Sequence, residues 1–210
     1  MPGHNSTADL IWTHTSGAKL YLGSLAAAQD AKHLQDLQVT KLVTCMLEPP
    51  AVVNESVQRH HVEIGDGNNV SITPFLEKAT AQIETWLATG LNVLVHCSSG
   101  ISRSATVMLG YLISYKKPLV SLLDTYIFVK NARSCINPGT QFLHDLQELE
   151  VKVQQSTEPS MTLVEYYAFT VQGVVEMYGA TATLEACIEA VRVSGYDTDM
   201  KIMAAAQSFL

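Results

Sequence analysis

The chain has 210 residues, of which 47% are hydrophobic and 16% charged, and this composition excludes intrinsic disorder. Its 13 Lys and Arg residues against 20 Asp and Glu residues give a formal net charge of −7, which disfavours nucleic-acid binding and a polybasic membrane patch. No apolar run approaches the roughly 20 residues that a membrane-spanning helix requires. We therefore expect a cytoplasmic protein, with the nucleus as a second compartment, that binds neither nucleic acid nor membrane.

The first half of the chain alternates β-rich runs with helical patterns. Residues 19–23 alternate and end in glycine, which predicts a short strand, and residues 24–37 have the apolar spacing of a helix. Residues 41–46 and 60–64 are β-rich and predict two further strands. Residues 65–69 consist of Gly, Asp and Asn, so we expect a loop there.

The central part of the chain predicts a helix, a buried strand and a second helix. The first helix is expected over residues 73–90, with a proline near its first position. Residues 92–96 are mostly apolar, as in a strand that is covered on both faces. Small residues at 98–102 predict a flexible turn, and the helical pattern resumes over residues 102–115.

Two more helical patterns, at residues 119–133 and 142–154, complete this region. Strands that alternate with helices are typical of an α/β domain. We therefore predict a central, mainly parallel sheet flanked by helices, and we assign this domain to residues 1–155.

A polar, proline-containing segment at residues 154–161 predicts a linker. Three short helical patterns come after it, at residues 162–178, 183–194 and 198–209. We expect them to form a small all-α region over residues 162–210.

A cysteine and an arginine flank the turn between the buried strand and the next helix. A strand that stops and feeds a helix turns backbone N–H groups inward, and such a turn binds anions. Gly100 allows the tight curvature, and Arg103 can bind two oxygens of a phosphate at the centre. Cys97 lies beneath that phosphate, where its thiolate is favoured and aligned for nucleophilic attack. The other residues of this phosphate-binding turn are Ser98, Ser99, Ile101 and Ser102.

The leaving oxygen needs a proton donor from another part of the chain. Asp66 is the best candidate by position, because it lies in the glycine-flanked loop after the third predicted strand, whereas Glu63 lies inside that strand. This chemistry requires no metal, and the four cysteines are too far apart to indicate a zinc cluster or a disulfide framework. We therefore predict neither a cofactor nor a metal. Cys45 is expected on a neighbouring strand, either as a packed core residue or as a resolving thiol for oxidised Cys97.

The central motif resembles the signature of the cysteine-dependent protein tyrosine phosphatases, and more closely that of their dual-specificity branch. The matching residues are His96-Cys97-x-x-Gly100-x-x-Arg103-Ser104. The segments KLYLGSLAAAQD, VEIGD and INPGTQFLHDLQELE resemble other parts of that branch, so the likeness extends over about residues 19–152.

The resemblance implies a role for each residue of the motif. Cys97 would form a phosphocysteine, and Arg103 would bind phosphate and the transition state. Ser104 would assist breakdown of the intermediate, and Asp66 would act first as an acid and then as a base on water. His96 would orient the loop and help to hold the pKa of Cys97 low.

The resemblance also implies a phosphoprotein substrate. Relatives that act on inositol phospholipids often carry lysines at the variable loop positions, and this chain has no basic residue there. Phosphotyrosine, phosphoserine and phosphothreonine are the expected substrates of the dual-specificity branch. Pro138-Gly139 stands where the family usually has Pro-Asn, so the amide that braces the loop is missing unless Asn137 replaces it. The alternative is therefore a catalytically weak phosphate-binding or scaffold protein.

The C-terminal pattern is similar to a ubiquitin-associated three-helix module. Its turn, Met177-Tyr178-Gly179, has the residue types of that module in a different order. Phe209 and Leu210 are expected to extend the apolar patch of this turn, and ubiquitin is the partner that the resemblance implies. In the alternative interpretation, these helices pack on the phosphatase domain or on a second copy of the chain.

Overall fold

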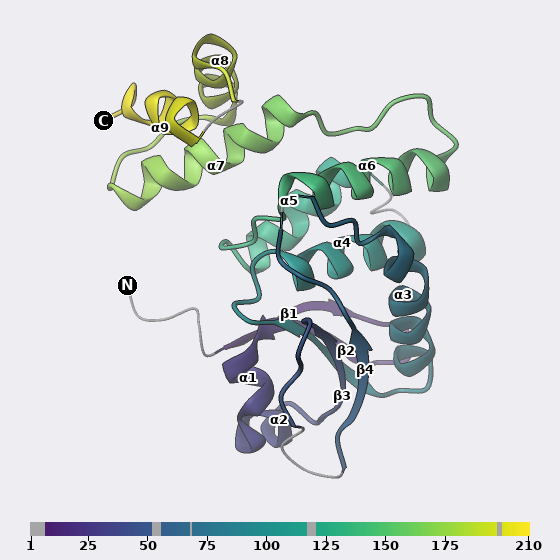
Figure 1. Ribbon diagram of the computed structural model, residues 1–210. Coiled ribbons are helices and arrows are strands. Elements are labelled where there is room, and N and C mark those ends of the chain that lie inside the picture. The colour runs from purple at the N-terminus through teal and green to yellow at the C-terminus, as the bar shows by residue number, and fades with distance from the viewer. Residues whose placement is uncertain (1–6, 52–55, 68, 117–120, 197–198) are drawn as a thin grey trace. The chain divides into compact units, whose positions relative to one another are not determined.

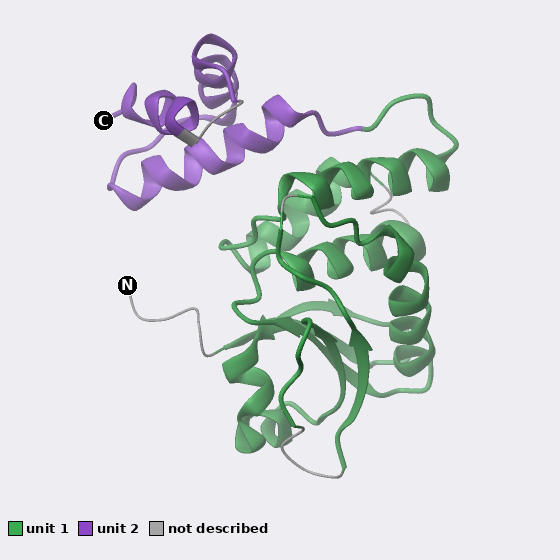
Figure 2. Cartoon of the chain, viewed as in Figure 1, with its two compact units in different colours: residues 1–159 green, residues 160–210 purple. Residues whose placement is uncertain are grey.

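The computed structural model describes residues 7–51, 56–67, 69–116, 121–196 and 199–210 (Figure 1). The chain divides into two compact units, a larger one at Met1–Pro159 and a smaller one at Ser160–Leu210 (Figure 2). No helix in the described part of the chain is both long and apolar enough to cross a bilayer.

The larger unit is built on a five-stranded sheet with the order β1-β2-β5-β3-β4. The strands are β1 (Ala8–Thr13), β2 (Lys19–Ser24), β3 (Val39–Cys45), β4 (Gln58–Val62) and β5 (Asn92–Cys97). The pairings of β2 with β5, β5 with β3 and β3 with β4 are parallel, whereas β1 runs antiparallel to β2. The predicted α/β fold with a mainly parallel sheet is therefore confirmed.

Helices cover both faces of this sheet (Figure 1). One face carries α3 (Thr73–Ala88), α4 (Arg103–Tyr115), α5 (Leu122–Ala132) and α6 (Thr140–Gln154), and the other carries α1 (Leu25–Gln29) and α2 (Ala31–Asp36). Because both faces are covered, the central strand β5 is apolar through Val93, Leu94 and Val95, which are fully buried. This rigid strand leads directly into the predicted turn.

Two local features differ from the predictions. The single helix expected at residues 24–37 is two helices, because Asp30 has an extended backbone and its side chain accepts a hydrogen bond from the His33 amide, which starts α2. The antiparallel edge strand β1 was not predicted, since its pairing register shifts between Leu10 and Trp12 and the strict alternation is lost. The first positions of the helix expected at 119–133 lie outside the described residues.

The smaller unit contains α7 (Leu163–Met177), α8 (Leu184–Ser194) and α9 (Asp199–Gln207). Thr162 and Glu165 form a reciprocal capping box that fixes the start of α7, and Thr183 caps α8. The three helices enclose a separate apolar core made of Ala168, Val171, Val175, Cys187, Val191, Ile202, Ala205 and Ala206. The pattern predicted at 198–209 begins at a residue outside the described ranges.

Candidate active site

The turn between β5 and α4 is fixed in place by hydrogen bonds that its carbonyl groups accept from residues outside it. Each carbonyl oxygen from Ser98 to Ser102 accepts a hydrogen bond from an amide or guanidinium outside the turn. The pairs are Ser98 with the Leu25 amide (3.1 Å), Ser99 with Arg133 Nη2 (3.0 Å), Gly100 with Arg133 Nε (2.9 Å), Ile101 with the Asn137 amide (2.9 Å) and Ser102 with the Thr106 amide (2.9 Å). Carbonyl groups fixed outward leave the amides of the turn facing its interior, which is the arrangement that binds an anion.

Gly100 is required at the crest of this turn. Its φ of +71° lies in the left-handed region, which disfavours residues with a side chain. A Cβ atom there would overlap the carbonyl oxygen of Gly23 on β2 and would lie 2.8 Å from Arg133 Nη2. The turn therefore packs closely against β2, with space for no side chain.

Cys97 ends β5 with its sulfur inside the turn, and its exposed fraction is 1%. The Gly100 amide and the Ser104 hydroxyl each donate a hydrogen bond to Sγ, both at 3.2 Å. Burial by itself raises the pKa of the Cys97 thiol. The hydrogen bonds from Ser104 and Gly100, together with the nearby Arg103 charge, outweigh burial, so the pKa is lower than that of an ordinary cysteine. These contacts favour a thiolate.

Arg103 is the first residue of α4, and its guanidinium closes the turn. Nη2 lies 3.2 Å from Ser98 Oγ and 3.3 Å from Asp66 Oδ2. Its buried Nε has no hydrogen-bond partner among the described residues. Because a buried, unpaired donor is costly, this atom is suited to bind an oxygen of a phosphate in the turn.

Asp66 comes to the same place from a distant part of the chain. It lies after β4 in a segment without regular structure, and its side chain is 47% exposed. The contact with Arg103 places its carboxyl group at the turn, where solvent can exchange protons with it. The structure therefore brings together the nucleophile, the arginine and the acid that the sequence predicts.

His96 lies on β5 behind the turn. Its Nε2 is 2.8 Å from Thr44 Oγ1 on β3, and burial lowers the pKa of His96 to about 4. The ring is therefore neutral near pH 7, and it supplies no positive charge to the Cys97 thiolate. Its contacts support a positioning role, and Thr44 is a partner that the sequence did not indicate.

The segment after α5 braces the turn through its main chain. The Asn137 amide donates to Ile101 O (2.9 Å), and the Gly139 amide donates to Ser102 Oγ (3.2 Å). The turn is therefore still bound to this segment, although Gly139 replaces the asparagine that is usual in the family. Arg133, which supports two of the carbonyl groups, was missed by sequence reasoning, because its contacts lie more than 30 residues away in the chain.

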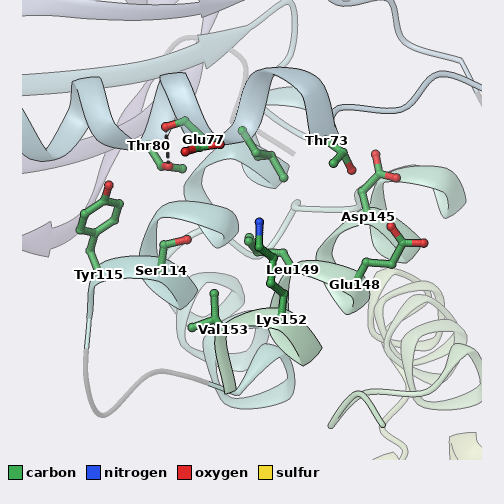
Figure 3. A pocket seen from close by; sticks show the side chains of 11 residues that line it. Thr73, Glu77, Thr80, Ser114, Tyr115, Asp145, Glu148, Leu149, Lys152 and Val153 are labelled. Atoms are coloured by element: carbon green, nitrogen blue, oxygen red, sulfur yellow. Dashed lines mark hydrogen bonds between the residues drawn. The ribbon is translucent and has the colours of Figure 1, made fainter. Parts of the chain in front are cut away.

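A separate cavity of about 360 Å³ lies among α3, the end of α4 and α6 (Figure 3). Leu76 and Leu149 line it together with the charged side chains of Glu77, Glu148 and Lys152. Its lining includes no cysteine and no residue of the turn, so it is separate from the candidate active site.

Comparisons with known proteins agree with this geometry. Residues 20–152, more than half of the chain, match the family model for the dual specificity phosphatase catalytic domain. Dual specificity protein phosphatase 2 from mouse is 34% identical over 134 residues, which is 64% of this chain but only 42% of that relative. The chain therefore spans less than half the length of this curated relative.

Solved structures of similar proteins cover the same part of the chain. The crystal structure of human DUSP28 has a TM-score of 0.64 and 28% identity, and the match covers 72% of this chain and 99% of that one. A mouse putative dual specificity phosphatase, complexed with zinc tungstate, also has a TM-score of 0.64, with 26% identity over 74% of this chain and 92% of that one. The chain belongs to the dual specificity phosphatase catalytic domain family.

Proposed function

We propose that this chain is a protein phosphatase that hydrolyses phosphotyrosine and phosphoserine or phosphothreonine through a phosphocysteine intermediate. The observation that carries the proposal is the pair of hydrogen bonds from Gly100 and Ser104 to the Cys97 sulfur, at the base of an anion-binding turn. Arg103 and Asp66 stand at the same turn. A catalytically weak phosphate-binding scaffold is disfavoured, because it has no use for a stabilised thiolate.

In the first step, the phosphate group of the substrate occupies the turn and is bound by its amides and by Arg103. Cys97 Sγ attacks phosphorus, and the S–P bond forms as the bond between phosphorus and the ester oxygen breaks. Asp66 gives its proton to the leaving oxygen, so the side chain of the substrate departs as a neutral hydroxyl group.

In the second step, water attacks the phosphocysteine. The Asp66 carboxylate accepts a proton from this water, a new P–O bond forms, and the S–P bond breaks to release inorganic phosphate. The returning thiolate is stabilised by the hydrogen bonds from the Gly100 amide and the Ser104 hydroxyl. Ser104 therefore makes sulfur a better leaving group in this step.

The side chains of the turn support a phosphoprotein substrate. Ser98, Ser99, Ile101 and Ser102 add no positive charge around the phosphate. A multiply phosphorylated lipid headgroup would need such charges for its other phosphate groups, and the net charge of −7 also opposes it.

The test is phosphate release from a panel of phosphotyrosine peptides, phosphothreonine peptides and phosphoinositides, with and without a chelator. We expect turnover of the peptides that is unaffected by the chelator. Cys97→Ser should abolish turnover but still bind phosphopeptide, because the amides and Arg103 remain. Turnover by Cys97→Ser at the rate of the parent chain would refute the mechanism, and a parent chain that binds but never turns over would favour the scaffold.

We also propose that residues 162–210 bind ubiquitin. Two apolar side chains at the C-terminal end of α7 support this, because Met177 is 59% exposed and Tyr178 is 67% exposed. Exposed apolar side chains that gather at one turn are typical of an interaction surface. The alternative partner is a second copy of the chain.

The ubiquitin proposal is tested by titrating ¹⁵N-labelled ubiquitin with the whole chain. We expect chemical-shift changes that disappear when Met177 and Tyr178 are both changed to alanine. Leu47→Ala, which removes a side chain of similar exposure (58%) from the larger unit, is the control. Absence of shifts at millimolar ubiquitin would refute the proposal, and a dimeric mass in light scattering that falls in the double variant would favour the second copy.

A further inference from the structure

An ion pair behind the turn joins the edge strand β1 to the loop that binds phosphate. The side chain of Arg133, directly after α5, is fully buried. Its Nη1 lies 2.6 Å from Asp9 Oδ2 on β1, while Nε and Nη2 bind the carbonyl oxygens of Gly100 and Ser99. We infer that Asp9 is a positioning residue for the phosphatase reaction, and that it acts through Arg133; this inference rests on the function proposed above.

The chemistry of the guanidinium explains why a carboxylate is needed there. A guanidinium is planar and rigid, so fixing one nitrogen fixes the direction of the others. Asp9 holds Nη1, and the remaining nitrogens are then aimed at two consecutive carbonyl groups. The carboxylate also balances a buried positive charge, which would otherwise be costly to desolvate.

Gly100 carries this effect to the nucleophile. Its carbonyl oxygen accepts from Arg133 Nε on one side of the turn, and its amide donates to Cys97 Sγ on the other side. A guanidinium free to rotate would release the carbonyl group and let the amide turn away from sulfur. Asp9 therefore influences the Cys97 thiolate without touching it.

The edge strand β1 is also connected to the turn through β2. Ala8 pairs with Gly23 of β2, and Gly23 is the residue that leaves no space for a side chain at Gly100. Asp9 is the next residue of β1, so its carboxylate approaches Arg133 from a strand whose position is set by the sheet. This gives β1 a function in addition to covering the sheet edge.

The test compares Asp9→Asn with Asp36→Asn in the full chain. Asp36 forms an exposed ion pair with Lys32 at 2.8 Å. Asp36→Asn therefore removes the same charge as Asp9→Asn, but at a site away from the turn. Two quantities are measured: kcat/KM for a phosphotyrosine peptide, and the pH dependence of Cys97 alkylation by iodoacetamide, followed by mass spectrometry. The melting temperature shows whether each variant is folded.

We expect Asp9→Asn to lower kcat/KM about ten-fold, since small misplacements in an active site cost one to two orders of magnitude. The midpoint of Cys97 alkylation should move to higher pH, while Asp36→Asn changes neither quantity. Asp9→Glu, which keeps the carboxylate, should show smaller changes in kcat/KM and in the alkylation midpoint than Asp9→Asn. Arg133→Lys should lower kcat/KM more than Asp9→Asn does, because an ammonium group cannot replace the planar guanidinium that binds both carbonyl groups.

The outcomes separate this inference from the proposed function. A folded Asp9→Asn variant with the kcat/KM and alkylation profile of the parent chain would overturn it, even if its melting temperature were lower. If the parent chain shows no turnover but Asp9→Asn still moves the alkylation midpoint, then the proposed function fails and the positioning role stands. Arg103 and Cys45, the charged and titratable neighbours of the Cys97 sulfur, are unchanged in every variant.

Discussion

Cys45 and Cys97 end two neighbouring parallel strands, and the pKa values of their thiols are shifted in opposite directions. Thr44 on β3 pairs with His96 on β5, and each cysteine is the next residue of its strand. Burial, and then the nearby Cys97 charge, raise the pKa of Cys45 well above the ordinary value, with only a partial opposing effect of Arg103. The pKa of Cys97 is lowered although it is also buried.

The residues after each strand account for this difference. After Cys45, the Met46 amide donates to Val62 O, so it continues the pairing with β4 and does not face the sulfur. After Cys97, the chain turns sharply, and the Gly100 amide and the Ser104 hydroxyl both donate to sulfur. Depth of burial therefore does not decide which thiol has the lower pKa; the hydrogen-bond donors around the sulfur do.

Among the changes that keep the Cys97 thiol, the largest effect should come from Gly100→Ala, which destroys the turn that distinguishes the two cysteines. The added Cβ overlaps the carbonyl oxygen of Gly23 and forces a side chain into the left-handed region. We expect kcat/KM to fall on the order of 1,000-fold, as when donors to a reacting anion are lost. We also expect the free energy of unfolding to fall by about 2–4 kcal/mol, measured with urea.

Gly17→Ala is the matched control for this prediction. Gly17 also has a positive φ, +87°, but a Cβ there would meet no atom within 4 Å. It should lose only about 1 kcal/mol of stability and keep its activity. Equal loss of activity in both variants would show that the tight contact at Gly100 is irrelevant.

Ser104→Ala should raise the pKa of the Cys97 thiol, and so make it more like the thiol of Cys45. The variant loses the hydroxyl donor to the sulfur, and a hydrogen bond to a charged group is worth about 1.5–3 kcal/mol. We therefore expect kcat to fall roughly 10- to 100-fold, with a burst of product that reveals slow breakdown of the phosphocysteine. Ser114→Ala, on the same helix but beside the separate cavity, should show neither change.

The burial of His96, one residue before Cys97, should make stability depend on pH. The folded pKa of His96 is lowered from 6.5 to about 4, so the unfolded chain binds a proton between these values when the folded chain does not. Stability is therefore fully present above pH 6.5 and declines as the pH falls toward 4, by about 3 kcal/mol in total. Urea unfolding at pH 7 and pH 5 should show about 2 kcal/mol of this loss. His96→Gln should reduce the difference, and His144→Gln, at an exposed site, should not.

The sequence was sufficient for the features that depend on neighbours in the chain. Cys97, Gly100 and Arg103 lie within seven residues, and a buried strand that feeds a helix determines their arrangement. Arg133 and Thr44 reach the same site only through the fold, so no local pattern indicates them.

The same reasoning explains the two errors in the fold. Ala8–Thr13 is a strand only because β2 is available for pairing, and its shifted register hides the alternation that a sequence pattern needs. The break at Asp30 was detectable in principle, because Asp is a preferred cap residue. It was missed because helix-forming residues continue on both sides.

The smallest effect should come from Cys45→Ala. A protonated, fully buried thiol contributes no charge to the reaction, so kcat/KM should stay within about two-fold of the parent chain. The same variant distinguishes the two interpretations of Cys45. If Cys45 is a resolving thiol, hydrogen peroxide oxidises Cys97 to a sulfenic acid, which condenses with the Cys45 thiol to give a disulfide and water. Dithiothreitol then restores the parent chain but not Cys45→Ala, whose sulfenic acid is oxidised further, whereas equal recovery of both chains would leave Cys45 as a packed core residue.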